Sequence, residues 1–221
     1  KSRLIGQAPR LYGKTLYINR LGGPQAIIDR DELRDSGLLV EAEVSSVQDL
    51  VSDPQLKPGA LDEAGYCAVI IDKYTALVSA NVLAKLKGAS DTRAVYGDNL
   101  RDGLRGLEFM QSWRRPVFLV LGEDYDKDEV GAMWWFPDLP GQFKYKFTEY
   151  VSLLARITVK EDPRAGTAVR RVQMQRAGNN VEARTREPSG KGPPFYESVD
   201  LSLKTVMEAA GFKNNHLPLL P

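Results

Sequence analysis

Apolar residues recur along the chain in short runs, and polar segments rich in glycine and proline separate these runs. The runs predict strands at residues 2–6, 25–29, 38–44, 66–72, 116–122, 151–160 and 169–176. Apolar residues at helical spacing predict helices at residues 16–21, 46–50, 78–86, 99–113 and 200–211. Strand and helix alternate as far as residue 121, so we expect an α/β fold. Its central sheet should be mostly parallel and flanked by helices, with antiparallel strands late in the chain.

Composition supports one globular domain over residues 1–221, with 43% hydrophobic and 27% charged residues. The formal net charge is +1, so any nucleic-acid partner requires a local basic patch rather than a bulk field. The one cysteine, Cys67, cannot form an internal disulfide, and the one histidine, His216, argues against a Cys/His zinc site. No apolar stretch approaches the length of a membrane span, so we expect a cytoplasmic protein without membrane contact.

A relaxed phosphate-binding loop, [AG]-x-x-x-x-G-K-[ST], lies near the start of the chain. Its residues are Ala8, Pro9, Arg10, Leu11, Tyr12, Gly13, Lys14 and Thr15. In such a loop backbone N–H groups surround the phosphates, the lysine reaches their outer oxygens and the hydroxyl binds Mg²⁺. The expected strand before it and helix after it favour this interpretation, with Lys14 on phosphate and Thr15 on the metal. A Gly-Lys-Thr turn in a surface loop is the alternative.

Carboxylates follow several of the predicted strands. Asp29, Asp31 and Glu32 come at the end of the strand at 25–29, although acids of this kind also suit a helix N-terminus. Asp72 closes the apolar run at 66–72, where an acid can orient the waters of a bound magnesium ion or simply cap a helix. Glu123 begins an acidic loop at 123–129. Parallel strands deliver their carboxyl ends to one edge, so we expect acid chemistry there.

Aromatic and basic residues cluster late in the chain. The candidate base-stacking residues are Tyr125, Trp134 and Trp135, although aromatic clusters more often pack in a core. The candidate phosphate contacts on DNA are Arg164, Arg170, Arg171 and Arg176. Arg184 and Arg186 follow as candidates for contact with the nucleotide of a neighbouring subunit. An equal alternative is that these two are solvated charges on an exposed strand.

The order of these motifs resembles the RecA-type P-loop ATPases, above all the short phage-encoded RecA-like recombination ATPases. The resemblance covers nearly the whole chain. It rests on residues 8–15 as Walker A, 28–31 as an acidic strand end, 69–72 as Walker B, and the segments 93–97, 137–141 and 184–186.

The resemblance implies a magnesium-dependent ATPase that assembles as a ring or filament on single-stranded DNA, in the host cytoplasm if phage-encoded. It places ATP and Mg²⁺ at Lys14, Thr15 and Asp72 and gives the water-activating role to Asp31, with Glu32 as the alternative. Glu123, at the next strand end, would sense the γ-phosphate only through water or magnesium, because like charges repel. Arg184 and Arg186 would act on the neighbouring subunit's nucleotide. Ala8 in place of glycine, the bulky Leu11 and Tyr12, and the short Asp31 favour the alternative of a P-loop relic that does not hydrolyse nucleotide and serves as a binding or assembly module.

Overall fold

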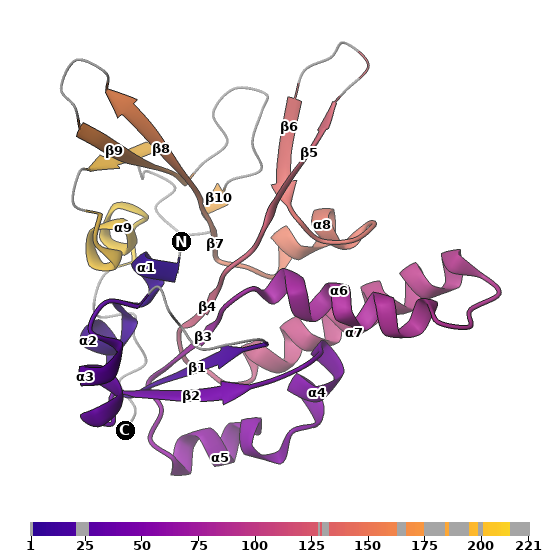
Figure 1. Ribbon diagram of the computed structural model, residues 1–221, viewed down its shortest axis with the longest axis horizontal. Coiled ribbons are helices and arrows are strands. Elements are labelled where there is room, and N and C mark those ends of the chain that lie inside the picture. Colours follow the sequence, from indigo (N-terminus) through magenta and orange to yellow (C-terminus); the bar gives the residue numbers. More distant parts are fainter. Residues whose placement is uncertain are drawn as a thin grey trace. The chain divides into compact units, whose positions relative to one another are not determined.

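The computed structural model describes residues 2–20, 27–127, 129, 133–162, 167–174, 184–185, 195–198 and 201–212, and its contacts form two compact units (Figure 1). The larger unit holds residues 2–122 and 137–150, and the smaller one holds 123–136 together with the chain from 151 onward. The single domain expected over residues 1–221 stays a prediction.

A four-stranded parallel sheet is the framework of the larger unit. Its strands are β1 (Thr15–Asn19), β2 (Leu39–Glu43), β3 (Ala68–Ile71) and β4 (Val117–Leu119), in the spatial order β2-β1-β3-β4. Strands β1 and β3 lie in the middle and are almost entirely buried, as expected of parallel strands covered on both faces. The α/β class and the parallel sheet are therefore confirmed.

Helices connect the strands and surround the sheet. Before β1 come α1 (Ser2–Ile5) and α2 (Ala8–Tyr12); α3 (Arg30–Asp35) precedes β2; α4 (Val47–Ser52), η1 (Pro54–Leu56) and α5 (Pro58–Glu63) precede β3; α6 (Tyr74–Leu86) and α7 (Thr92–Gln111) precede β4; α8 (Phe143–Lys146) and η2 (Phe147–Glu149) close the unit. The predicted cap of the helix at 46–50 is confirmed, because the Ser46 side chain accepts the Asp49 N–H at 3.1 Å. The predicted helix at 99–113 forms most of α7, which begins earlier, after the capping residue Asp91.

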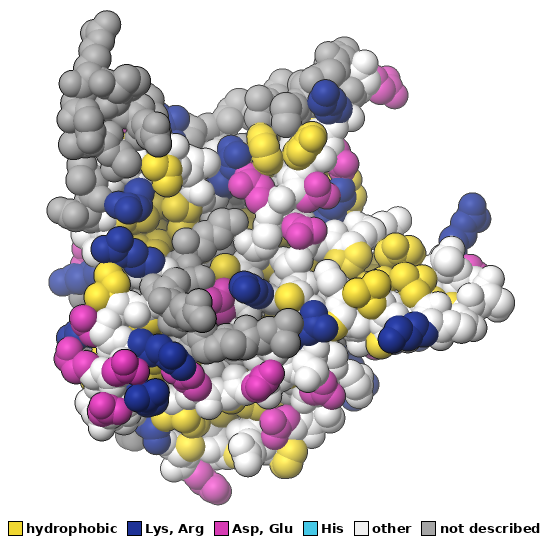
Figure 2. Space-filling model, viewed as in Figure 1, with side chains coloured by type: hydrophobic (Ala, Val, Ile, Leu, Met, Phe, Trp, Pro, Cys, Tyr) yellow, Lys and Arg dark blue, Asp and Glu magenta, His cyan; other side chains and the backbone are white. Residues whose placement is uncertain are grey.

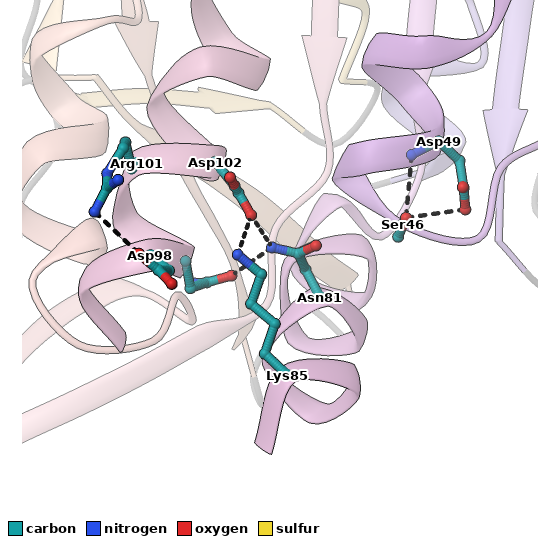
Figure 3. Close-up of polar contacts among 8 residues, drawn as sticks. Ser46, Asp49, Asn81, Lys85, Asp98, Arg101 and Asp102 are labelled. Carbon is teal, nitrogen blue, oxygen red and sulfur yellow. Dashed lines mark hydrogen bonds and ion pairs between the residues drawn. The ribbon is translucent and has the colours of Figure 1, made fainter. Parts of the chain in front are cut away.

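A partly buried polar network joins α6 to α7 (Figure 3). The Asn81 side-chain amide donates to Asp102 at 3.0 Å and to Asn99 at 3.2 Å, and the Lys85 ammonium donates to Asp102 at 2.5 Å. Burial raises the pKa of Asp102, but the bonds from Lys85 and Asn81 outweigh it, so the pKa lies below its ordinary value. Hydrophobic side chains gather on part of the molecular surface (Figure 2), and Leu83 of α6 is 60% exposed.

Two glycines let α7 approach its neighbours closely. A Cβ added at Gly103 would lie 2.6 Å from the Phe143 ring, and one at Gly106 would lie 2.7 Å from Val47. Phe143 and Val47 are themselves buried, in α8 and α4. The packing of α7 against both elements therefore depends on the missing side chains.

Arg115 fastens the amino edge of the sheet, where β3 and β4 begin. Its side chain is only 4% exposed and donates to the carbonyl oxygens of Trp113 at 2.9 Å, Leu61 at 3.2 Å and Tyr66 at 2.5 Å. It also pairs with the Asp62 carboxylate. One guanidinium thus satisfies a carbonyl of α5, one of the turn before β3 and one of the turn before β4.

The smaller unit is built from paired strands. β5 (Glu123–Lys127) pairs with β6 (Met133–Pro137), β7 (Leu153–Leu154) with β10 (Arg184–Thr185), and β9 (Thr167–Gln173) lies between β8 (Arg156–Asp162) and β11 (Phe195–Ser198); helix α9 (Leu203–Ala209) follows. The pairs of β9 with β8 and β11 are antiparallel, which confirms the late antiparallel strands. The acidic segment at 123–127, which was predicted as a loop, is strand β5.

Candidate functional site at the carboxyl edge of the sheet

The strand order creates a switch point between β1 and β3. From β1 the chain passes to β2 on one side, and β3 then lies on the other side of β1. In open α/β sheets the crevice outside the carboxyl ends of the two strands at such a point is the usual ligand site. Here β1 ends at Asn19, and Asp72 directly follows β3.

Asp72 is the central residue of this edge. It is 8% exposed, and its N–H donates to the Ile18 carbonyl of β1 at 3.0 Å. The buried Tyr17 hydroxyl donates to Asp72 Oδ2, whereas the buried Oδ1 has no hydrogen-bond partner among the described residues. Burial and the bond to Asp72 raise the pKa of Tyr17, so its hydroxyl keeps the proton that it donates. A buried carboxylate oxygen without a donor is costly, and a cation would satisfy it.

The turn after Asp72 ties β3 to β4. Lys73 adopts a left-handed backbone conformation with φ 61°, and helix α6 begins at the next residue. The Tyr74 N–H donates to the Val120 carbonyl at 2.9 Å, and the Gly122 N–H donates to the Thr75 hydroxyl at 2.9 Å. Strained backbone of this kind concentrates at functional sites. Bonds made by Tyr74 and Thr75, the two residues after Lys73, therefore tie the turn after Asp72 to the chain that follows β4.

A second acid lies at the end of β4. The Asp138 N–H donates to the Gly122 carbonyl at 3.2 Å, and a Cβ at Gly122 would come within 2.7 Å of Asp138 Oδ2. Asp138 is exposed and belongs to the same unit as Asp72. Glycine at position 122 thus makes room for a carboxylate at the carboxyl edge of the sheet.

The prediction of a phosphate loop at residues 8–15 is wrong, because the elements around it differ from those expected. The expected strand at 2–6 is helix α1, residues 8–12 form helix α2, and the expected helix after Gly13 is strand β1. A phosphate loop needs a strand before it and a helix N-terminus after it, and this segment has the opposite order. Gly13, with φ 96°, instead makes the turn that joins α2 to β1.

Lys14 and Thr15 lie at the amino edge, far from Asp72. The Lys14 ammonium donates to the Ala64 carbonyl at 2.7 Å, and the fully buried Thr15 hydroxyl donates to the Gly13 carbonyl at 2.8 Å. At ~3.3 Å per residue, the length of β1 puts roughly 13 Å between the levels of Thr15 and Asp72. Ligands of one magnesium ion lie within a few ångströms of each other, so Thr15 and Asp72 cannot bind the same ion as predicted.

The acids predicted to activate water lie in and beside α3, which leads into the amino end of β2. Residues 27–29 form a bend and turn instead of the predicted strand, whose residues 25 and 26 lie outside the described part. Arg10 of α2 pairs with Asp29 at 2.9 Å and with Glu32 at 3.2 Å, and Asp31 pairs with Arg34 at 3.3 Å. Exposed ion pairs at helix starts account for all three acids, and the structure does not bring them to Asp72.

Glu123 and the predicted stacking residues occur in the smaller unit. Glu123 pairs with Arg156, whose guanidinium lies over the Trp135 ring at 4.3 Å. The Tyr125 ring contacts Trp135 with centroids 5.5 Å apart, and Trp134 is half-buried. A base could stack on Trp135 only if one of these neighbours moved.

The predicted DNA-binding and trans-acting arginines are described only in part. Arg170 and Arg171 lie on β9, and Arg171 pairs with Glu197 of β11. Arg184 belongs to β10 and faces Leu154 of β7 in the register. The remaining ones, Arg164, Arg176 and Arg186, lie outside the described residues.

Tyr17 is a site residue that the sequence interpretation missed. In the register it lies opposite Ile70, two residues before Asp72, so both side chains project from one face of the sheet. The signal was present in the run Thr15, Leu16, Tyr17 and Ile18, which is rich in residues that favour strands.

Comparisons with known proteins add no family to this geometry, because no protein-family model and no curated protein matches the chain. Among the described residues, no group of three or more acidic, histidine or cysteine side chains lies together as a metal site. The same part of the chain contains no helix with the length and hydropathy to cross a membrane.

Proposed function

We propose that the carboxyl edge at the β1–β3 switch point binds a magnesium nucleotide, with ATP as the expected ligand. The observation that carries this proposal is the buried Asp72 Oδ1, which has no hydrogen-bond partner among the described residues. Magnesium in nucleotide sites takes one or two protein carboxylates and completes its shell with phosphates and waters. A single buried carboxylate therefore suffices on the protein side.

The resemblance to RecA-like ATPases supports a nucleotide site at this edge only through Asp72, the expected Walker B acid. Lys14 and Thr15 do not fit the phosphate-binding role, because the Lys14 ammonium and the Thr15 hydroxyl donate to main-chain carbonyls at the opposite edge. When bound, the metal would neutralise phosphate charge. The protein would supply a fixed carboxylate and exclude water from it.

Hydrolysis stimulated by single-stranded DNA is the wider form of this proposal, with assembly into a ring or filament as the resemblance implies. A binding or assembly module that does not hydrolyse nucleotide is the second candidate. The position of α3 favours it, because Asp31 and Glu32 lie with their arginine partners at the other edge and do not supply a water-activating acid beside Asp72.

The test is the binding of a fluorescent ATP analogue with Mg²⁺ to the whole chain and to two variants. Asp72→Asn should weaken binding about tenfold or more, since contacts to charged groups contribute ~1.5–3 kcal/mol. Lys14→Ala, the matched control at the amino edge, should change it less than twofold. Weakening by Lys14→Ala with no effect of Asp72→Asn would overturn the proposal.

Phosphate release measured with and without oligo-dT separates the two candidates. Turnover that rises with oligo-dT and disappears in Asp72→Asn supports the ATPase. Intact nucleotide binding without turnover in either condition supports the binding module.

A further inference from the structure

We infer that Tyr17 is a positioning residue for the metal-binding carboxylate: its hydroxyl holds Asp72 Oδ2 and leaves Oδ1 as the oxygen that binds the cation. This inference rests on the proposed function of the same edge. It gives the two carboxylate oxygens of Asp72 different roles, and it assigns a role to Tyr17 on the neighbouring strand.

The geometry of the two strands supports this role. Tyr17 lies on β1 and Asp72 follows β3. The register of the two strands places Tyr17 beside Ile70, so the phenol extends toward the carboxyl edge to reach Asp72. Tyr17 is fully buried, so its ring is fixed by packing on all sides. A phenol donates only one hydrogen bond and can therefore satisfy only one of the two oxygens. Partners of this kind orient a ligand and raise its affinity for the metal.

Tyr74 provides a matched control within the same unit. It is as fully buried as Tyr17 and lies two residues after Asp72, at the start of α6. Its hydroxyl has no hydrogen-bond partner among the described residues. Tyr17→Phe and Tyr74→Phe thus remove the same atom from equally buried rings, but only the first removes a bond to Asp72.

The first measurement is the affinity for Mn²⁺ in the presence of ADP, followed by electron paramagnetic resonance. Tyr17→Phe should weaken Mn²⁺ binding about 10-fold to 100-fold, the range for losing a group that orients a ligand. Tyr74→Phe should leave the affinity unchanged. Equal affinities of Tyr17→Phe and the unaltered protein, with binding lost in Asp72→Asn, would overturn the inference and leave the proposed function standing.

The second measurement reports the hydroxyl itself. Tyrosines labelled with ¹³C at the ring carbon that bears the hydroxyl give resonances sensitive to hydrogen bonding, and the Tyr17 resonance is the one lost in Tyr17→Phe. It should shift when Mg²⁺ and ADP are added, because the cation withdraws charge from the carboxylate that accepts its bond, and Asp72→Asn should abolish this response. A Tyr17 resonance that does not move on saturation would also overturn the inference.

Two other outcomes are decisive. Should Tyr17→Phe fail to fold, the Tyr17 resonance is identified as the tyrosine signal displaced in Asp72→Asn without added metal, and its response to Mg²⁺ and ADP decides as before. Absence of Mn²⁺ binding by the unaltered protein, or full binding by Asp72→Asn, would overturn the proposed function and this inference with it.

Discussion

The close approach of α7 to α8 gives a prediction whose sign follows from the structure. Alanine at Gly103 would gain ~1 kcal/mol in helix propensity, because glycine is the poorer helix former. The added Cβ, however, would lie 2.6 Å from Phe143 Cε1, and ordinary contacts begin near 3.4 Å, so the ring or the helix must move by roughly 0.8 Å.

Phe143 has little room to move. It is fully buried and packs edge-on against Phe147, with ring centroids 6.1 Å apart. Overpacking of a rigid site costs ~1–3 kcal/mol, which offsets or exceeds the propensity gain, so Gly103→Ala should lower the free energy of unfolding by about 0–2 kcal/mol.

Gly97→Ala in the same helix is the control. Gly97 is exposed and a Cβ there meets nothing within 4 Å, so only the propensity gain remains and the variant should be more stable by ~0.5–1 kcal/mol. Urea unfolding monitored by circular dichroism measures both. If Gly103→Ala were as stabilising as Gly97→Ala, the packing of α7 described above would be wrong.

Two further predictions concern charge and nucleic acid. The pKa of Asp102 is lowered in the folded state, so the ionised carboxylate stabilises the fold above its ordinary pKa of 3.8, and this stabilisation is lost as the pH falls further. In urea unfolding, the stability advantage of the unaltered protein over Asp102→Asn should therefore shrink between about pH 5 and pH 3. A constant difference would contradict this assignment. For DNA, oligo-dT at low salt should quench tryptophan emission. Trp135→Ala should weaken oligo-dT binding about tenfold, since a stacked base contributes ~1–3 kcal/mol. Unchanged emission at low salt, with nucleotide and Mg²⁺ present, would remove DNA from the proposed function.

The sequence predicted the parallel sheet best where apolar runs were long and β-branched. Residues 68–71 form β3 with all four side chains buried, and Asp72 follows at the expected edge. The helix at 99–113 was predictable because its apolar residues recur at helical spacing, and its extension back to Thr92 follows from the capping Asp91.

The region before residue 20 could not be predicted in the same way. A short apolar run such as Leu16–Ile18 fits a buried strand or a helix equally well, so the Gly-Lys-Thr pattern decided the prediction and decided it wrongly. Pro9 near the start of α2 was a contrary signal, because proline suits the first turn of a helix. The bond from Tyr17 to Asp72 joins residues 55 positions apart, and only the strand order reveals it.

Arg115 makes the two turns at the amino edge behave as one. Its guanidinium holds carbonyls in the segment before β3 and in the segment before β4, so neither turn can open without releasing this shared donor. Arg115 thus links the two turns as a disulfide would, but through hydrogen bonds. The one cysteine of the chain cannot form an internal disulfide. Hydrogen exchange in these two turns should therefore be coupled, because opening either one breaks bonds to the same guanidinium.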